Sequence, residues 1–373
     1  MLKVLRYRVY PTKAQKTTMN NTLELCRWTY NETLALRKDA WESEQKNIGY
    51  YDSKKMIPIW KKEKPELKTV YSQVLQEVVK RVDLAFQAFF RRVKNGEKAG
   101  YPRFRGYGRY DSFTYTQSGF SLDSDRLTLS KIGDIKIKLH RPIEGKIKRL
   151  NVRKMPTGKW FVSFLVETDT PLELQKTGLS VGVDAGIKNF LTLSDGNYVP
   201  NPRFFVTEEK FLAKVQRKLS KLEKGTPERA KALKAVQRVY ERISNKREDF
   251  IQKVSLNLVR NYDLIIFEDL NIKGMVKNHK QAKHIADVAW NKLVTITSYK
   301  AEWAGKRVEL VNPCNTSQMC SGCGQIVKKE LSERIHSCPC CGLTLDRDHN
   351  AAINIMRLGL QSLRITDRCP SLQ

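Results

Sequence analysis

The sequence lacks any long hydrophobic run, and no segment approaches the roughly 20 apolar residues that a membrane-spanning helix needs. Its first residues, MLKVLRYRVYP, also lack the apolar core of a secretory signal peptide. We therefore expect a cytoplasmic protein with no membrane partner. No internal repeat is evident, which makes solenoid and repeat architectures poor explanations of the chain.

Acidic residues are scarce beside basic ones. The chain has 39 Asp and Glu against 68 Lys and Arg, a net charge of +29 in 373 residues. Solubility alone needs a net charge of only about 2–8 in a small domain, whereas a strongly basic surface attracts phosphate backbones. With 40% hydrophobic residues the chain can still form real cores. The composition predicts a folded nucleic-acid-binding protein of two or three domains.

Cysteine is nearly absent outside one short region, so a disulfide framework is a poor interpretation. Two Cys-x-x-Cys pairs, 14 residues apart, instead predict a structural zinc site with four thiolate ligands: Cys320, Cys323, Cys338 and Cys341. Cys340 is an alternative to Cys341. The glycine that follows Cys341 favours Cys341, because a zinc knuckle needs a residue that tolerates positive φ there.

The pattern of apolar residues indicates an α/β protein of several parts. Residues 2–10 alternate like a strand, and residues 13–93 show helical spacing. Short alternating segments between 119 and 170 predict a small antiparallel barrel or sandwich. A helical hairpin over 208–258 follows, and residues 262–270 form an apolar strand that ends in two acids.

Three acidic residues stand at the ends of predicted elements: Asp184 in VGVDAG, Glu268 in IIFED and Asp348 in DRDHNAA. Each alone fits a turn, a strand end or a helix cap. Together, carboxylates on adjacent strands can hold two divalent metals, and Mg²⁺ prefers such oxygen ligands. Asp346 is the alternative to Asp348.

Five segments, GVDAGIKNF, NKREDF, IIFEDLNIKGM, NTSQMCSGCG and DRDHNAAINI, occur in an order that resembles the TnpB family of insertion sequences. These OrfB-type proteins are similar to type V CRISPR effector nucleases, and the resemblance covers nearly the whole chain. It implies an RNase H-like RuvC nuclease domain split by a Cys₄ zinc ribbon, with an N-terminal helical module and a small β-barrel (wedge) domain. The implied ranges are 1–12 (first wedge strand), 13–118 (helical recognition module with a basic-aromatic loop), 119–175 (wedge barrel), 176–312 (RuvC motifs one and two), 313–344 (zinc ribbon), 345–360 (RuvC motif three) and 361–373 (tail).

The resemblance implies an RNA-guided DNA endonuclease of a transposable element, acting at a prokaryotic nucleoid. Its partners would be a guide RNA from the transposon end and double-stranded target DNA. Asp184, Glu268 and Asp348 would bind Mg²⁺ and catalyse hydrolysis; Asp348 is preferred because it directly precedes x-Asn-Ala-Ala. Two alternatives stay open: a guide-directed DNA-binding regulator without cleavage, and an accessory transposase acting on transposon ends.

The resemblance also suggests Gln76 and Thr116 as readers of a short DNA motif beside the target. Gln suits adenine and Thr suits the thymine methyl group, although both also fit ordinary surface positions. The densest basic-aromatic stretch is expected to contact the backbone of the guide RNA or heteroduplex, and a solvated loop is the alternative. Its candidate contacts are Arg91, Arg92, Arg103 and Arg105.

Overall fold

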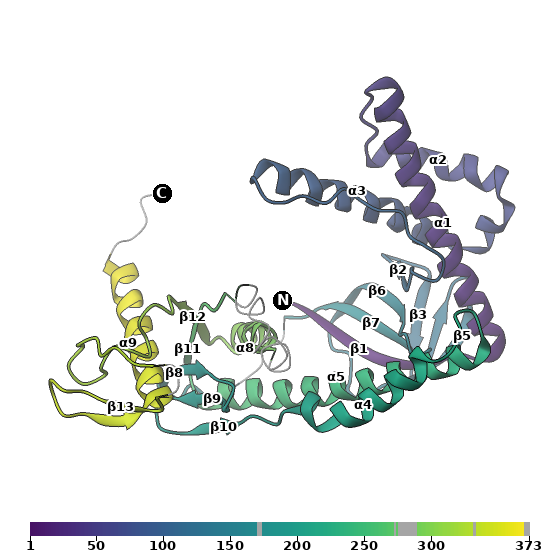
Figure 1. Ribbon diagram of the computed structural model, residues 1–373. Coiled ribbons are helices and arrows are strands. Elements are labelled where there is room, and N and C mark those ends of the chain that lie inside the picture. The colour runs from purple at the N-terminus through teal and green to yellow at the C-terminus, as the bar shows by residue number, and fades with distance from the viewer. Residues whose placement is uncertain (170–173, 272–273, 275–288, 331–332, 369–373) are drawn as a thin grey trace. The chain divides into compact units, whose positions relative to one another are not determined.

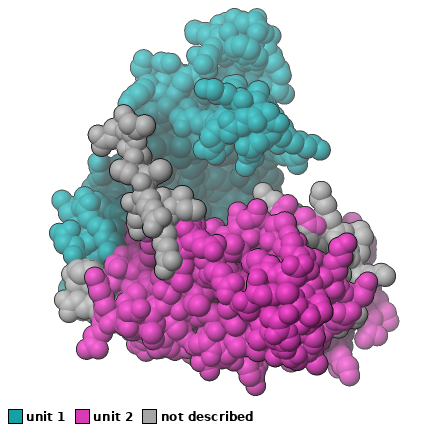
Figure 2. Space-filling view, turned by 90° about the vertical axis from the view of Figure 1, so that its left-hand side faces the viewer, with its two compact units in different colours: residues 1–170 teal, residues 171–373 magenta. Residues whose placement is uncertain are grey.

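The computed structural model describes residues 1–169, 174–271, 274, 289–330 and 333–368. The chain divides into two compact units, residues 1–170 and 171–373 (Figure 2). Across the described residues, no helix combines the length and the apolar character needed to cross a membrane.

Unit 1 contains an antiparallel sheet of seven strands in the order β2-β6-β7-β1-β5-β4-β3 (Figure 1). Its strands are β1 (Leu2–Tyr10), β2 (Ser112–Tyr115), β3 (Phe120–Asp123), β4 (Arg126–Leu129), β5 (Gly133–Lys138), β6 (Lys146–Lys154) and β7 (Trp160–Glu167). Alternate residues of β7, from Trp160 to Val166, are buried, so one face of the sheet is apolar. Strand β2 falls in the range that we assigned to the helical module. It joins the sheet because Phe113 and Tyr115 bury their rings there.

The helices of unit 1 are α1 (Lys13–Glu44), α2 (Tyr50–Glu63) and α3 (Ser72–Lys94), with a short 3₁₀ helix, η1 (Pro65–Thr69), before α3. Helix α1 begins at a capping box between Thr12 and Gln15, as the sequence predicts. Buried residues of α1, α3 and the sheet belong to one hydrophobic core. The helical module and the sheet are therefore one packed unit.

Unit 2 contains a mixed sheet of five strands in the order β10-β9-β8-β11-β12 (Figure 1). The strands are β8 (Ser180–Ala185), β9 (Asn189–Leu193), β10 (Tyr198–Pro200), β11 (Leu264–Glu268) and β12 (Arg307–Val311). Strands β8, β11 and β12 are parallel, whereas β9 and β10 extend β8 as an antiparallel meander. A two-stranded ribbon of β13 (Ile335–Ser337) and β14 (Thr344–Asp346) lies in the cysteine-rich segment.

The helices of unit 2 are α4 (Phe204–Ser220), α5 (Pro227–Asn261), α8 (Trp290–Trp303) and α9 (Arg347–Arg368). Helices α4 and α5 form the predicted hairpin, with a small core of their own. Helices α5 and α8 share a larger core with the five-stranded sheet.

The two faces of this sheet can be assigned from side-chain alternation. Val183 and Phe267 belong to the core shared with α5 and α8. Gly182 and Ile266 are their neighbours along the strands and therefore point to the other face. Helix α9 lies there: a Cβ atom on Gly182 would stand 2.1 Å from the carbonyl oxygen of Ala352. The even-numbered residues of β8 and β11 thus face α9.

Candidate active site and metal centre

Asp184 and Glu268 lie at the carboxyl ends of two neighbouring parallel strands. In the register of β8 and β11, Val183 lies opposite Phe267, which places Glu268 level with Asp184. Both positions are even-numbered, so both carboxylates are on the α9 face. The carboxyl edge of parallel strands is where α/β proteins usually bind their ligands.

Asp346 and Asp348, the two alternatives for the third acid, have different surroundings. The Asp346 carboxylate accepts hydrogen bonds from the backbone N–H of Asp348 (2.9 Å) and of His349 (3.3 Å), so it caps the N-terminus of α9. Asp348 lies in the first turn of α9 and is only 9% exposed. A cap accounts for Asp346, whereas no helix-capping role accounts for the buried carboxylate of Asp348.

The pKa values show that these acids influence one another. Burial raises the pKa of Asp184 well above its usual range, and the negative charges of Glu268 and Asp348 raise it further. Burial also raises the pKa of Glu268, although a hydrogen bond from Thr316 acts in the opposite direction. The sheet edge therefore concentrates negative charge without enough protein cations to balance it, and a bound divalent cation would relieve that repulsion.

Arg347 partly balances this charge. Its Nε and Nη2 atoms lie 3.3 and 3.2 Å from Oδ1 of Asp348, and Nη1 of Arg334 lies 3.9 Å from Oδ2. Arg347 also lowers the pKa of Asp184, against the effect of the neighbouring acids.

A chain of hydrogen bonds that the sequence did not reveal connects α9 to Glu268. The Thr316 hydroxyl donates to Oε1 of Glu268 at 2.5 Å. The fully buried amide of Asn354 donates to the carbonyl oxygens of Thr316 (2.9 Å) and Met319 (2.6 Å). Asn350 adds a bond to Met319 at 2.8 Å. The helix that carries Asp348 thus also fixes the segment that orients Glu268.

Asn350 and Asn354 had a detectable signal in the sequence. They are four residues apart, so they share one face of a helix. Both are buried there beside Ala351 and Ala352, and buried amides need hydrogen-bond partners.

The four predicted cysteine ligands come together in one cluster. All four Sγ atoms lie within 4.8 Å of one another, and Cys340 is outside this group. The Sγ atoms of Cys320 and Cys341 are 3.6 Å apart, as are those of Cys323 and Cys338. Tetrahedral zinc with bonds of about 2.3 Å to sulfur would separate them by about 3.8 Å. The donor set and its spacing therefore fit a metal such as zinc.

The carboxylates are spaced more widely than the thiolates. Of the described residues, the cysteines make up the one set of three or more ligands whose donor atoms all approach within 4.8 Å. A cavity of about 320 Å³ opens beside the sheet edge and is lined by Glu268, Asp269, Ala185 and Asn291, among others. Its other lining residues include Phe267 and, from α8, Trp290 and Leu293, so the cavity lies on the α8 side of the sheet and not on the α9 face that carries the carboxylates.

The candidate nucleic-acid contacts all lie in unit 1. Thr116 follows β2, and its hydroxyl donates to Oε1 of Gln73 at 3.2 Å. Gln76 is one turn further along α3, on the same side of the helix as Gln73, so the two proposed readers lie near each other. Arg91 and Arg92 are exposed in the last turn of α3. Arg103 and Arg105 are exposed in the loop between α3 and β2.

The chain is similar to known proteins along almost its whole length. Residues 163–279 match the OrfB_IS605 family, described as "Probable transposase", and residues 290–355 match "Cas12f1-like, TNB domain". Residues 1–46 match a family described as a helix-turn-helix domain, although the structure has β1 and the single helix α1 there.

Two curated relatives are similar over most of their own length. One, from Streptomyces pristinaespiralis, is named "Putative RNA-guided DNA endonuclease"; it is 36% identical, over 96% of this chain and 89% of the relative. The other, "Putative RNA-guided DNA endonuclease InsQ" from Escherichia coli K12, is 31% identical over 96% and 92%.

A solved structure has the same fold. "Cryo-EM structure of the Cas12f1-sgRNA-target DNA complex" matches 95% of this chain and 98% of that chain, with a TM-score of 0.58 and 12% identity. At this identity the likeness concerns the fold alone.

Proposed function

Because the chain belongs to the TnpB family of OrfB-type insertion-sequence proteins, we propose that it is an RNA-guided DNA endonuclease of a transposable element. Its partners would be a guide RNA, transcribed from the transposon end, and a double-stranded DNA target. Pairing between guide and target would select the DNA sequence, while the protein holds the backbone.

The proposal of nuclease activity rests mainly on the grouping of Asp184, Glu268 and Asp348. Two of the acids lie level on parallel strands, and the third is buried at the start of α9. The negative charges of Glu268 and Asp348 both raise the pKa of Asp184. The mixed sheet with acids at its carboxyl edge supports an RNase H-like RuvC domain. The cysteine-rich segment between Glu268 and Asp348 would be the insertion that splits it.

The three acids would hold Mg²⁺. When bound, divalent metals activate a water nucleophile and stabilise the leaving oxygen of a phosphodiester. Thr316 would hold the Glu268 carboxylate in a fixed orientation for metal binding through its 2.5 Å hydrogen bond. Arg347 would limit the repulsion between Asp348 and its neighbours before the metal binds.

The cysteine cluster would hold structural zinc with Cys341, and not Cys340, as the last ligand. Four thiolates leave no open position for a catalytic water. Asn350 and Asn354 connect the start of this ribbon to α9, so the zinc would stabilise the segment that positions Glu268.

The test is to express the protein with its native flanking DNA, purify it, and sequence the RNA that remains bound. That RNA should have a defined end that directs cutting of a matching plasmid and not of a scrambled one. Cutting without any bound RNA would favour an unguided transposase. Guided binding with no cutting would favour a regulator. Either result would refute the proposed activity.

A further inference from the structure

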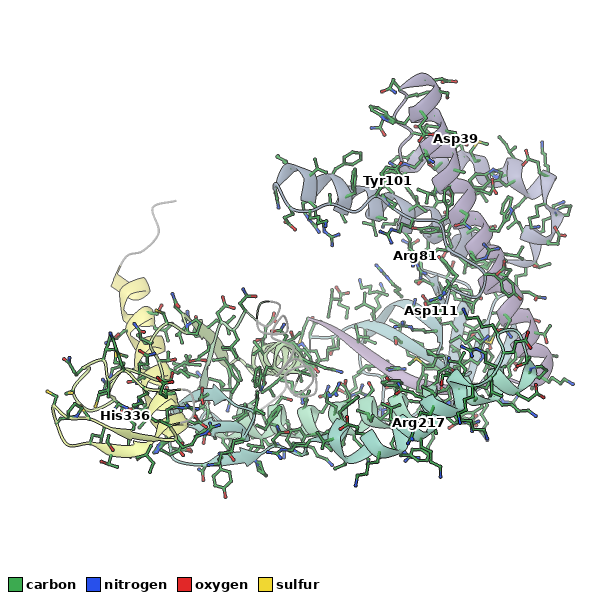
Figure 3. The ribbon with its side chains drawn as sticks, viewed as in Figure 1. Asp39, Arg81, Tyr101, Asp111, Arg217 and His336 are labelled. Atoms are coloured by element: carbon green, nitrogen blue, oxygen red, sulfur yellow. The ribbon has the colours of Figure 1, made fainter. Side chains whose placement is uncertain are left out.

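Unit 1 contains a cavity of its own, lined by none of the three acids. It has a volume of about 220 Å³, and its wall includes Arg81, Arg105, Arg109, Tyr30 and Tyr110. Arg81 comes from α3, and Asp111 lies just before β2 (Figure 3). Three arginines thus line the cavity, one from α3 and two from the basic-aromatic loop.

Positive charge in this cavity is not balanced by acids. The lining carboxylate of Asp111 is engaged by Arg153, with Nε at 3.0 Å and Nη2 at 2.9 Å from its Oδ2. No described carboxylate forms an ion pair with Arg81, Arg105 or Arg109. Three guanidinium groups that lack carboxylate partners around a hollow form a site for an anion.

Arg81 is held in place by neutral groups. Its Nη1 donates to the carbonyl oxygen of Ser112 (2.9 Å) and the hydroxyl of Tyr110 (3.2 Å), and its Nη2 donates to the Thr114 hydroxyl (2.7 Å). Its Nε has no partner among the described residues and is not sealed from the solvent. The guanidinium is therefore fixed in orientation and still has a donor to offer.

The loop is also anchored at Arg105. Its backbone N–H donates to Oδ1 of Asn31 (2.8 Å), and its carbonyl oxygen accepts from Asn31 and Arg27, each at 3.0 Å. The Arg105 guanidinium lies 5.5 Å from the ring centre of Tyr30. These contacts hold a loop arginine over the cavity before any ligand binds, which lowers the ordering cost of binding.

The loop also points to the kind of anion. Phe104 and Tyr107 are 53% and 85% exposed, and exposed aromatic rings beside basic groups typically stack on unpaired bases. We propose that this cavity binds one phosphodiester of an unpaired nucleic-acid segment, whose adjacent bases stack on Phe104 and Tyr107. The inference rests on the proposed function in that the ligand is taken to be the guide RNA or the target DNA.

The test is alkylation interference on the assembled complex, with the RNA and each DNA strand labelled in separate arms. Wild-type protein should show one phosphate in an unpaired segment whose ethylation blocks binding. That signal should disappear in Arg105→Ala and Arg109→Ala, each with about tenfold weaker binding of a short oligouridylate. The labelled strand that gives the signal identifies the source as RNA or DNA.

Lys98→Ala is the matched control: Lys98 is exposed in the same loop and carries one positive charge, but it does not line the cavity. It should keep the interference signal and bind within about threefold of the wild type, as expected for a screened surface charge. Arg105→Lys keeps the charge without the forked donor geometry and should lose the signal; circular dichroism would check that each variant is folded.

An interference pattern that is the same in all four variants would overturn the inference, as would equal weakening of binding by Lys98→Ala and Arg105→Ala. Target cutting is recorded in the same preparations. If the wild type cuts under RNA guidance while the pattern does not depend on the cavity, the inference alone fails. If the wild type retains no RNA, the proposed function fails.

Discussion

Replacing Gly182 by alanine should separate the two elements that carry Asp184 and Asp348. Gly182 lies two residues before Asp184 on β8, and α9 crosses directly over it. An added Cβ would lie 2.1 Å from the carbonyl oxygen of Ala352 and 2.5 Å from the backbone nitrogen of Met356. Both are backbone atoms of a helix, so no side chain can rotate away to make room.

The size of the effect follows from this overlap. Carbon and carbonyl oxygen approach to about 3.3 Å, so α9 must move by roughly 1 Å. Overpacking of this kind typically costs about 1–3 kcal/mol of stability. Because Asp348 lies in the first turn of α9, it would move away from Asp184 with the helix. A misplacement of about 1 Å in a catalytic group can reduce the rate about 100-fold.

The assay is guided cutting of a target plasmid under single-turnover conditions, with DNA binding and thermal unfolding measured in parallel. Gly182→Ala should cut about 100-fold more slowly and bind DNA nearly as well as the wild type. Gly49→Ala, where an added Cβ meets nothing within 4 Å, should behave like the wild type. Gly359→Ala should be intermediate, because the three atoms nearest to its Cβ would be side-chain atoms of Ile266, from 2.7 Å, which can shift more easily than backbone. Wild-type cutting by a folded Gly182→Ala protein would refute the reasoning.

Three further predictions concern the site and its support. Asp348→Asn should abolish cutting, whereas Asp346→Asn should keep it, since asparagine also caps helices; equal loss in a guided cutting assay would contradict the distinction. Removing the metal with a chelator, or replacing Cys341 by serine, should lower the melting temperature in scanning calorimetry, and Cys340→Ser should not; an unchanged melting temperature after chelation would count against the site. Asp263 is partly exposed and pairs with the buried Lys306 at 3.0 Å. Its partial burial favours the neutral form, but hydrogen bonds from Gly178 N–H, Lys306 and a second backbone N–H lower its pKa to about 2. Its contribution to stability is therefore full above its unfolded pKa of about 3.9 and lost as the pH falls toward 2. The melting temperature of Asp263→Asn should lie several degrees below that of the wild type at pH 7, and the gap should close in acid; a gap that does not change with pH would contradict this.

The sequence predicted best those features that depend on neighbours along the chain. The capping box of Thr12 and Gln15 is confirmed, and so is the hairpin of α4 and α5. The family that the motifs indicated is confirmed as well. Such features follow from local spacing, which the sequence displays directly.

Features made by residues far apart in the chain were not accessible in the same way. The bond between Thr316 and Glu268 spans 48 residues, and nothing near either residue announces it. The sequence around Gly182 does not indicate that a helix packs against this glycine; only the structure shows α9 there. Strand β2 was missed because four residues carry too little alternation to be separated from the loop before them.

The cavity around Arg81 illustrates the same limit. The sequence identified the basic-aromatic loop but not Arg81, which is 24 residues earlier than Arg105 and belongs to the helix α3. Arg105 is placed at the cavity by packing of this loop against α1 through Asn31, and Arg81 by hydrogen bonds to Ser112 and Thr114.

The central claim is that Asp184, Glu268 and Asp348 form a metal-dependent site that cuts DNA. Its most direct test is to compare wild-type protein and Asp184→Ala, each with bound guide RNA, for cutting of a matching plasmid with and without Mg²⁺. We expect cutting only by the wild type with Mg²⁺, while Asp184→Ala binds RNA and DNA within a few-fold of the wild type. Cutting by Asp184→Ala, or by the wild type without any divalent metal, would contradict the account.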